Sequence, residues 1–154
     1  MDFSDMTFPY NTKTTAPSET EALGRELAEI MKKDGTLPRF VAMYGDLGVG
    51  KTAFTRGFVS AFSESARVKS PTFSLVNEYG KGKDAVFHFD MYRIDSEDDL
   101  WSIGFYDYLD RQGIAIAEWC EKIPFALPES YVKVTISKIS EESPDERMIK
   151  IELV

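Results

Sequence analysis

The order of apolar and polar positions predicts several strands. Continuous apolar runs at 39–44 ("RFVAMY") and 114–119 ("IAIAEW") are typical of strands buried on both faces of a sheet. Apolar and polar residues instead alternate at 131–137 ("YVKVTIS") and 148–154 ("MIKIELV"), which indicates half-buried strands. The turn-rich "EESPDER" between these two favours an antiparallel pair. Two more strands are expected in "SLVNEYG" and "AVFHFDMY", joined through the turn-like "KGKD".

A helix is predicted over 17–35 ("PSETEALGRELAEIMKKDG"). Ser18 and Glu21 match a capping box at its start, and Gly35 is a typical stop. The apolar positions of this stretch share one helical face: Leu23, Leu27 and Ile30.

Two further helical stretches complete the pattern, 51–63 ("KTAFTRGFVSAFS") and 96–113, the latter interrupted at Gly104. The elements together predict one α/β domain over residues 1–154, with a mixed, mostly parallel sheet flanked by helices. The C-terminal antiparallel pair is expected to finish one edge of this sheet. Residues 1–16 are expected to be an irregular N-terminal segment with a short strand near 7–11. The phenylalanines of the second helix lie on one stripe: Phe54, Phe58 and Phe62.

The segment between the first buried strand and the second helix carries chemistry. "GDLGVGKT" (45–52) fits G-x-x-x-x-G-K-[ST], the phosphate loop of nucleoside triphosphatases. Its glycines let backbone N–H groups close around phosphates, and the following helix points its positive end at the same anion. Lys51 supplies charge for the β- and γ-phosphates, and the Thr52 hydroxyl is placed to bind Mg²⁺. The domain is therefore expected to be of the phosphate-loop type and to bind ATP or ADP with Mg²⁺.

Mg²⁺ at such a loop needs a second anchor, normally an acidic residue at the end of a neighbouring parallel strand. "AVFHFD" ends at Asp90, and "IAIAE" ends at Glu118. A solvated carboxylate at a strand end is common, but two in one small phosphate-loop domain favour function. One would hold the metal and the other would orient the attacking water. The spacing does not decide which does which.

Four other residues have two interpretations each. Thr72, in "KSPTFSL", is either a switch hydroxyl that senses the γ-phosphate or a turn hydroxyl beside Pro71. Arg93 either contacts phosphate or, more simply, pairs with a surface acid. Trp119, expected on the opposite side of the strand from Glu118, is either a platform on which the base stacks or, more simply, a core residue. His88 is interpreted as a strand side chain rather than a catalytic base.

Composition narrows the function further. The net charge of −8 opposes direct binding of tRNA or DNA, which requires clustered Lys and Arg. Cys120 is the only cysteine, so no internal disulfide can form, and a cytoplasmic location is expected. No apolar run is long enough to cross a membrane, and "MDFSDMTFPY" lacks the features of a secretory signal. One His and one Cys effectively exclude a structural zinc site.

Longer motifs resemble a known family. "GDLGVGKTAFTRGF", "SPTFSLVNEY", "HFDMYRI", "DLWSIGFYDYLD" and "GIAIAEWCEKIP" occur in the order and spacing of the TsaE (YjeE) family. The resemblance covers about 18–128 and implies a bacterial ATPase of tRNA threonylcarbamoyladenosine (t6A) biosynthesis. It further implies slow hydrolysis of Mg-bound ATP in support of a TsaB–TsaD heterodimer, which modifies the adenosine beside the anticodon of ANN-decoding tRNAs. The tRNA would be held by these partners, in agreement with the acidic charge.

The resemblance also implies roles for individual residues. Glu118 would be the second metal ligand beside Thr52. Asp90 would act near the γ-phosphate and the attacking water, so Asp90, Glu118 and Lys51 are the expected catalytic residues. Residues 18–20 would lie near the adenine. The expected nucleotide contacts are Asp46, Leu47, Gly48, Val49, Gly50, Lys51, Thr52, Ala53, Thr72, Asp90 and Trp119.

Three positions depart from the family pattern: Val49 and Ala53 in the loop, and Cys120, where proline usually follows Glu-Trp. Two alternative functions stay open. A small-molecule kinase would need an arginine-rich lid, whereas residues 93–113 have two arginines against six acids. A nucleotide sensor without turnover would have the same sequence features. The acidic and aromatic "SEDDLWSIGFYDYLD" is either a docking surface or, more simply, an amphipathic helix.

Overall fold

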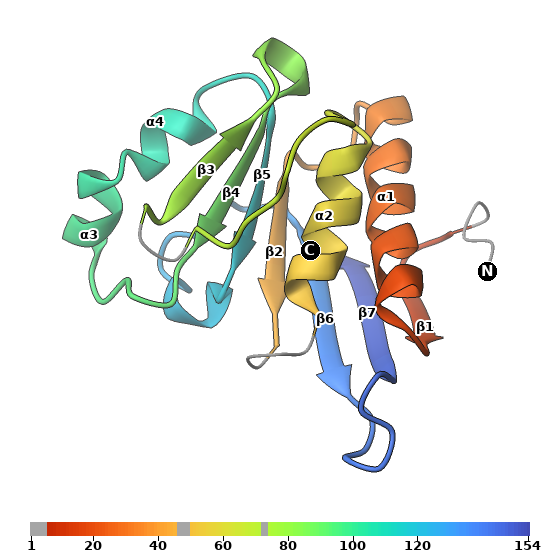
Figure 1. The fold of residues 1–154 in the computed structure, drawn as a ribbon. Helices are drawn as coiled ribbons and strands as arrows, with labels where there is room; N and C mark the ends of the chain where they lie inside the picture. The colour runs from red at the N-terminus through yellow and green to blue at the C-terminus, as the bar shows by residue number, and fades with distance from the viewer. Residues whose placement is uncertain (1–5, 46–49, 72–73) are drawn as a thin grey trace.

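The fold is built on one seven-stranded sheet. The computed structural model describes residues 6–45, 50–71 and 74–154. The strands run in the order β1-β7-β6-β2-β5-β4-β3. The central strands β6, β2, β5 and β4 are parallel, β3 is antiparallel on one edge, and β7 and β1 are antiparallel on the other (Figure 1). Their bounds are β1 (Tyr10–Thr14), β2 (Phe40–Tyr44), β3 (Val76–Tyr79), β4 (Val86–Asp90), β5 (Ile114–Glu118), β6 (Val132–Lys138) and β7 (Arg147–Leu153).

The predicted mixed α/β fold is confirmed, but the N-terminal segment differs from expectation. Residues 10–14 form β1, three residues later than the strand that was predicted, and pair with β7. The C-terminal pair β6–β7 therefore does not finish the edge, because β1 covers β7. The sequence of β1, "YNTKT", is mostly polar, so its place depends on backbone hydrogen bonds that apolar periodicity does not report.

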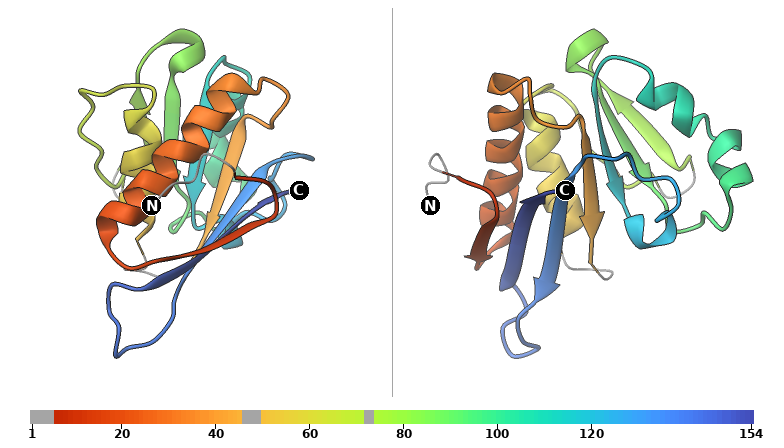
Figure 2. Two further views of the ribbon diagram at one scale, coloured as in Figure 1. Left: turned by 90° about the vertical axis from the view of Figure 1, so that its right-hand side faces the viewer. Right: turned by 180° about the vertical axis from the view of Figure 1, so that it is seen from behind.

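Helices cover both faces of the sheet. α1 (Pro17–Lys33) and α2 (Lys51–Ser60) pack on one face, and the short α3 (Glu97–Ser102) and α4 (Phe105–Leu109) on the other (Figure 2). The predicted interruption at Gly104 is confirmed. Two 3-10 turns, η1 (Gly82–Asp84) and η2 (Cys120–Lys122), precede β4 and follow β5. No helix in the described part of the chain is long and apolar enough to cross a bilayer.

The predicted capping box at Ser18 is wrong. Helix α1 begins at Pro17, the first residue of the predicted stretch, so its N-cap is Ala16, two residues before Ser18, and Ala16 has no side-chain hydrogen bond. Proline fits the first helical position because it lacks an N–H and its φ is already helical. Glu19 takes the stabilising role instead, since its carboxylate accepts hydrogen bonds from the Thr15 N–H and hydroxyl, each at 2.6 Å. These bonds favour the charged carboxylate and lower its pKa.

Two glycines bring α1 and α2 into backbone contact. A Cβ on Gly24 would lie 2.0 Å from the Phe54 carbonyl oxygen, and one on Gly57 would lie 1.8 Å from the Glu21 carbonyl oxygen. Only glycine permits such an approach. The close crossing, together with the buried Phe54 and Phe58, fixes the position of α2 over the sheet.

Strand alternation sorts side chains onto the two faces. In β4, Phe87 and Phe89 join the core beneath α3 and α4, whereas Val86 joins the core beneath α1 and α2. His88 and Asp90 share the face of Val86, because side chains two residues apart point the same way. In β5, Ile114 and Ile116 also face α2, so the next residue of that set, Glu118, does too. The acidic strand ends therefore face the helix that follows the phosphate loop.

Candidate active site

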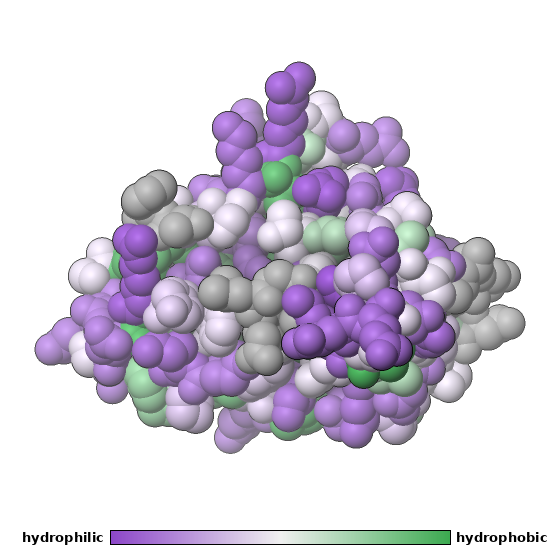
Figure 3. All heavy atoms as spheres, turned by 60° about the horizontal axis from the view of Figure 1, so that its bottom comes forward, coloured by the Kyte–Doolittle hydropathy of each residue, from purple (hydrophilic) through white to green (hydrophobic). Residues whose placement is uncertain are grey.

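A cavity lies where β4 and β5 end beside the start of α2. Its volume is about 310 Å³, and it is lined by Gly50, Lys51, Thr52, Ser70, Asp90, Glu118 and Trp119. The end of the molecule at which the parallel strands finish is mostly hydrophilic (Figure 3). The cavity brings together the residues that the loop motif and the two strand ends single out.

A second cavity of similar volume, about 320 Å³, lies at the amino ends of β2, β4 and β5. It is lined in part by Arg39, Lys83 and Arg111, and contains none of the predicted site residues. Volume alone therefore does not identify the site. The first cavity is the candidate site because it joins the end of the glycine loop to the two carboxylates.

Lys51 is held inside the first cavity by two contacts. Its ammonium donates a hydrogen bond to the Gly45 carbonyl oxygen at 2.6 Å and lies 3.9 Å from the centre of the Trp119 ring. The residue is only 5% exposed. An ammonium has three donors and is attracted to the ring face, so this arrangement keeps a positive charge ready for an anion. Gly50, with φ 107°, makes the left-handed turn that starts α2.

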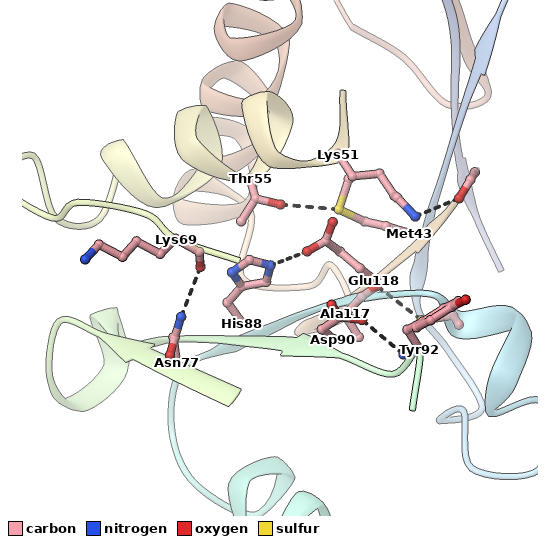
Figure 4. A network of polar contacts seen from close by, with 12 residues as sticks. Met43, Lys51, Thr55, Lys69, Asn77, His88, Asp90, Tyr92, Ala117 and Glu118 are labelled. Carbon is pink, nitrogen blue, oxygen red and sulfur yellow. Dashed lines mark hydrogen bonds and ion pairs between the residues drawn. The ribbon is translucent and has the colours of Figure 1, made fainter. Parts of the chain in front are cut away.

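Asp90 and Glu118 lie directly opposite each other in the β4–β5 ladder. Glu118 is 5% exposed, and its Oε2 lies 2.6 Å from Nε2 of the buried His88 (Figure 4). Asp90 is more open to solvent, and its Oδ1 accepts the Tyr92 backbone N–H at 3.0 Å. The two carboxylates are neighbours with different surroundings, which suits them to different tasks.

Of the predicted site residues that the structure describes, all but Ala53 line the cavity. Ala53 is buried in the first turn of α2 and does not line the cavity. A Cβ on Gly50 would lie 3.8 Å from the Thr20 methyl group, so the expected adenine segment 18–20 reaches the end of the loop. The predicted contacts Asp46, Leu47, Gly48, Val49 and Thr72 lie outside the described residues.

Strand alternation predicts Trp119 in the core, whereas the family resemblance implies that it contacts the nucleotide; the structure gives it a place in both surroundings. Its ring packs against the α3/α4-side core, but it also lines the cavity. The reason is its backbone, since β5 ends at Glu118 and Trp119 adopts φ 60°. This turn carries the ring under Lys51 and against Tyr92, whose ring centre lies 5.0 Å away. Tyr92 did not stand out in the sequence.

His88 was interpreted as an ordinary strand side chain, and its contact with Glu118 was missed. The alternation of β4 indicates that His88 shares the face of Asp90, which it precedes by two residues, but the contact with Glu118 also requires the β4–β5 register. The neighbouring Cys120 has no such contact with the cavity. It is fully buried, its Sγ donates to the Ala117 carbonyl oxygen at 3.2 Å, and burial raises the pKa of the thiol to about 12.

The donor set of the cavity is made of oxygen atoms. The Thr52 hydroxyl and the Glu118 and Asp90 carboxylates are hard ligands of the type Mg²⁺ prefers. Within residues 6–45, 50–71 and 74–154, no group of three or more His, Cys, Asp or Glu could hold a metal by itself. Mg²⁺ fits this arrangement because it usually takes one or two protein ligands and fills its other positions with water and phosphate oxygens.

A buried parallel strand, a glycine loop and a helix, with acidic residues at the ends of the next two strands, define an α/β domain of the phosphate-loop class. Comparison with known families identifies the branch of that class. The family "Threonylcarbamoyl adenosine biosynthesis protein TsaE" matches residues 14–149. The chain therefore belongs to the TsaE family of tRNA threonylcarbamoyladenosine biosynthesis.

Individual relatives support the same family assignment. The tRNA threonylcarbamoyladenosine biosynthesis protein TsaE of Bacillus subtilis is 34% identical over 137 residues, which cover 89% of this chain and 81% of the relative. The Haemophilus influenzae protein of the same name is 40% identical over 114 residues, 73% of this chain and 72% of the relative. A crystal structure of Bacillus subtilis YdiB superposes with a TM-score of 0.69 at 29% identity, covering 96% of this chain and 87% of that one.

Proposed function

We propose that this chain binds ATP with Mg²⁺ in the cavity at the start of α2 and hydrolyses it in support of the threonylcarbamoyl modification of tRNA. One observation carries the proposal: Lys51, Thr52 and two acidic strand ends, far apart in sequence, line a single cavity. The family assignment supplies the pathway, and the cavity supplies the chemistry.

The surroundings of each side chain support a division of tasks. Lys51 would lie against the β- and γ-phosphates, exchanging its carbonyl contact for charged oxygen. Thr52 and Glu118 would hold Mg²⁺, which neutralises phosphate charge when bound. Glu118 suits this role because it is buried and already oriented by a hydrogen bond. Asp90 would orient the attacking water, since one of its oxygens accepts the Tyr92 N–H and the carboxylate remains accessible.

The partners are part of the proposal. With a net charge of −8, the chain is poorly suited to hold tRNA, so a TsaB–TsaD heterodimer would bind the tRNA and transfer the group. ATP hydrolysis here would support or reset that complex. Without these partners, we expect the chain to hydrolyse ATP only slowly.

The decisive experiment measures ATP hydrolysis by the purified chain with and without TsaB and TsaD. We expect the rate to rise when both partners are present, and no tRNA modification when they are absent. Lys51→Ala is the matched control, because loss of the phosphate-binding charge should abolish nucleotide binding and the stimulated rate together. Unchanged hydrolysis on adding both partners would overturn the proposed coupling. Unchanged nucleotide affinity in Lys51→Ala would overturn the site itself.

A further inference from the structure

His88 is the only histidine of the chain and is completely buried. Its Nε2 lies 2.6 Å from Glu118 Oε2, whereas its Nδ1 has no hydrogen-bond partner among the described residues. Buried polar atoms are normally hydrogen-bonded, so the single partner that His88 has among the described residues is informative. The one contact it makes is with an acidic residue of the candidate active site.

The contact fixes which nitrogen carries hydrogen. A carboxylate oxygen at 2.6 Å is an acceptor, so Nε2 must donate to it. Nδ1 is then an unprotonated acceptor, because a buried N–H without a partner would add a further penalty. For a neutral imidazole, the contact with Glu118 therefore favours the Nε2–H form.

The backbone around His88 makes this hydrogen bond rigid. β4 lies between β5 and β3, and His88 is opposite Ile116 on one side and Asn77 on the other. Its side chain reaches diagonally across to Glu118, two positions beyond Ile116 on β5 (Figure 4). The donor thus lies on a strand that is paired along both edges, and it can constrain the carboxylate that accepts from it.

We infer that His88 is a positioning residue for Glu118. By binding Oε2, it sets the orientation of the carboxylate, and Oε1 would remain available to hold Mg²⁺ in the cavity. Hydrogen bonds behind a ligand commonly govern metal affinity in this way. The inference rests on the proposed function, since it concerns how the same cavity takes Mg²⁺.

Two variants separate positioning from packing. In His88→Gln, the amide nitrogen can take the place of Nε2 and donate to Glu118. In His88→Asn, the shorter side chain stays polar but does not reach. Calorimetry would measure ADP affinity with Mg²⁺ and with a chelator, and electron paramagnetic resonance would measure Mn²⁺ affinity of the ADP complex. We expect His88→Asn to weaken metal affinity about 10-fold or more, while its affinity for ADP in the presence of chelator stays unchanged. We expect the metal affinity of His88→Gln to stay within about threefold of the wild-type value.

The outcomes are distinguishable. Wild-type protein whose ADP affinity ignores Mg²⁺ would overturn the proposed function together with this inference. If Mg²⁺ strengthens ADP binding by the wild-type protein and strengthens it equally in His88→Asn, the positioning role alone would be overturned. Equal losses in the Asn and Gln variants, accompanied by equal drops in Tm, would show that His88 only packs the core.

A measurement on the wild-type chain keeps the inference testable if both variants fail to fold. Long-range ¹H–¹⁵N spectra of untagged protein report one imidazole, because there is one histidine. We expect the pattern of the Nε2–H form, with a shift of the Nε2 resonance when Mg²⁺ is added to the ADP complex. An exchanging mixture of tautomers, or an Nε2 signal insensitive to Mg²⁺, would contradict the inference.

Discussion

At the scale of single residues, the site depends on a contrast between two carboxylates that face each other across a ladder. Glu118 is enclosed and hydrogen-bonded to a buried imidazole, whereas Asp90 is partly solvated and accepts a backbone N–H. A buried carboxylate has little freedom to reorient, and an accessible one can exchange water. The two environments therefore favour metal binding at Glu118 and handling of water at Asp90.

This contrast predicts different defects for matched amide variants. Glu118→Gln removes the negative charge from the metal side, and we expect the Mg²⁺ dependence of ADP binding to weaken about 10-fold or more. Asp90→Asn should leave that dependence within about threefold and lower turnover by about 100-fold, the lower range for loss of a general base. Metal-dependent calorimetry and a phosphate-release assay measure the two effects. Equal metal dependence in both variants would contradict the division of tasks.

The sequence predicted the residues of the cavity better than their orientations. The loop motif and the apolar runs ending in Asp90 and Glu118 place those groups at one sheet edge by topology alone. The position of Trp119 depends on a left-handed backbone turn, which local residue type does not reveal. The contact of His88 depends on strand register, which is set by long-range pairing.

At the scale of elements, the position of α2 is fixed by its crossing with α1. Backbone meets backbone at Gly24 and Gly57, so the two helices behave as one rigid layer above the sheet. The first turn of α2 carries Lys51 and Thr52. Any separation of the helices would displace these side chains from the carboxylates on β4 and β5.

Replacing Gly57 with alanine tests this crossing. In most helices that change stabilises, by up to about 1 kcal/mol, because alanine is the better helix former. Here the added methyl would meet the Glu21 carbonyl oxygen at 1.8 Å, so we expect a net loss of about 2 kcal/mol in urea-unfolding free energy. Gly35→Ala is the control, since nothing lies within 4 Å of its added Cβ, and it should change stability by less than about 1 kcal/mol. A Gly57→Ala variant as stable as Gly35→Ala would disprove the contact.

The elements with strong periodicity were predicted, and so were β3, β4 and the helical stretch interrupted at Gly104. α1, α2, β2, β5 and the β6–β7 pair follow from apolar spacing. The N-cap of α1 was wrong because Pro17 occupies the first helical position, which makes Ala16 rather than Ser18 the capping residue. β1 was misplaced because an edge strand of polar residues has no apolar period to read.

At the scale of the whole molecule, charge distribution decides what the chain can bind unaided. The basic residues that line the second cavity are already engaged in part: Arg111 forms a bidentate pair with Glu78, and Arg39 donates to the Met31 carbonyl oxygen. Lys83 adds one more cation against a net charge of −8. This is a small basic area on an acidic protein.

We therefore expect the purified chain to bind tRNA no more tightly than about 10⁻⁴ M at physiological salt, the weak end of non-specific binding. Filter binding with labelled tRNA measures this, with the TsaB–TsaD heterodimer as the comparison. Tight binding that is lost in an Arg39→Glu, Lys83→Glu double variant would contradict the expectation and assign nucleic-acid contacts to the amino ends of the strands.

The pairing of β1 with β7 joins the first and the last strands of the sheet in sequence order, which affects the order of folding during synthesis. The ribosome makes β1 first, yet its hydrogen-bonding neighbour emerges only after every other strand of the sheet. At 5–20 residues per second, the polar edge segment waits on the order of ten seconds for a partner. During that interval the nascent chain has β2, α2, β4 and β5, but no finished edge beside β6. The pairing of β1 with β7 can therefore form only after the other strands of the sheet have been synthesised.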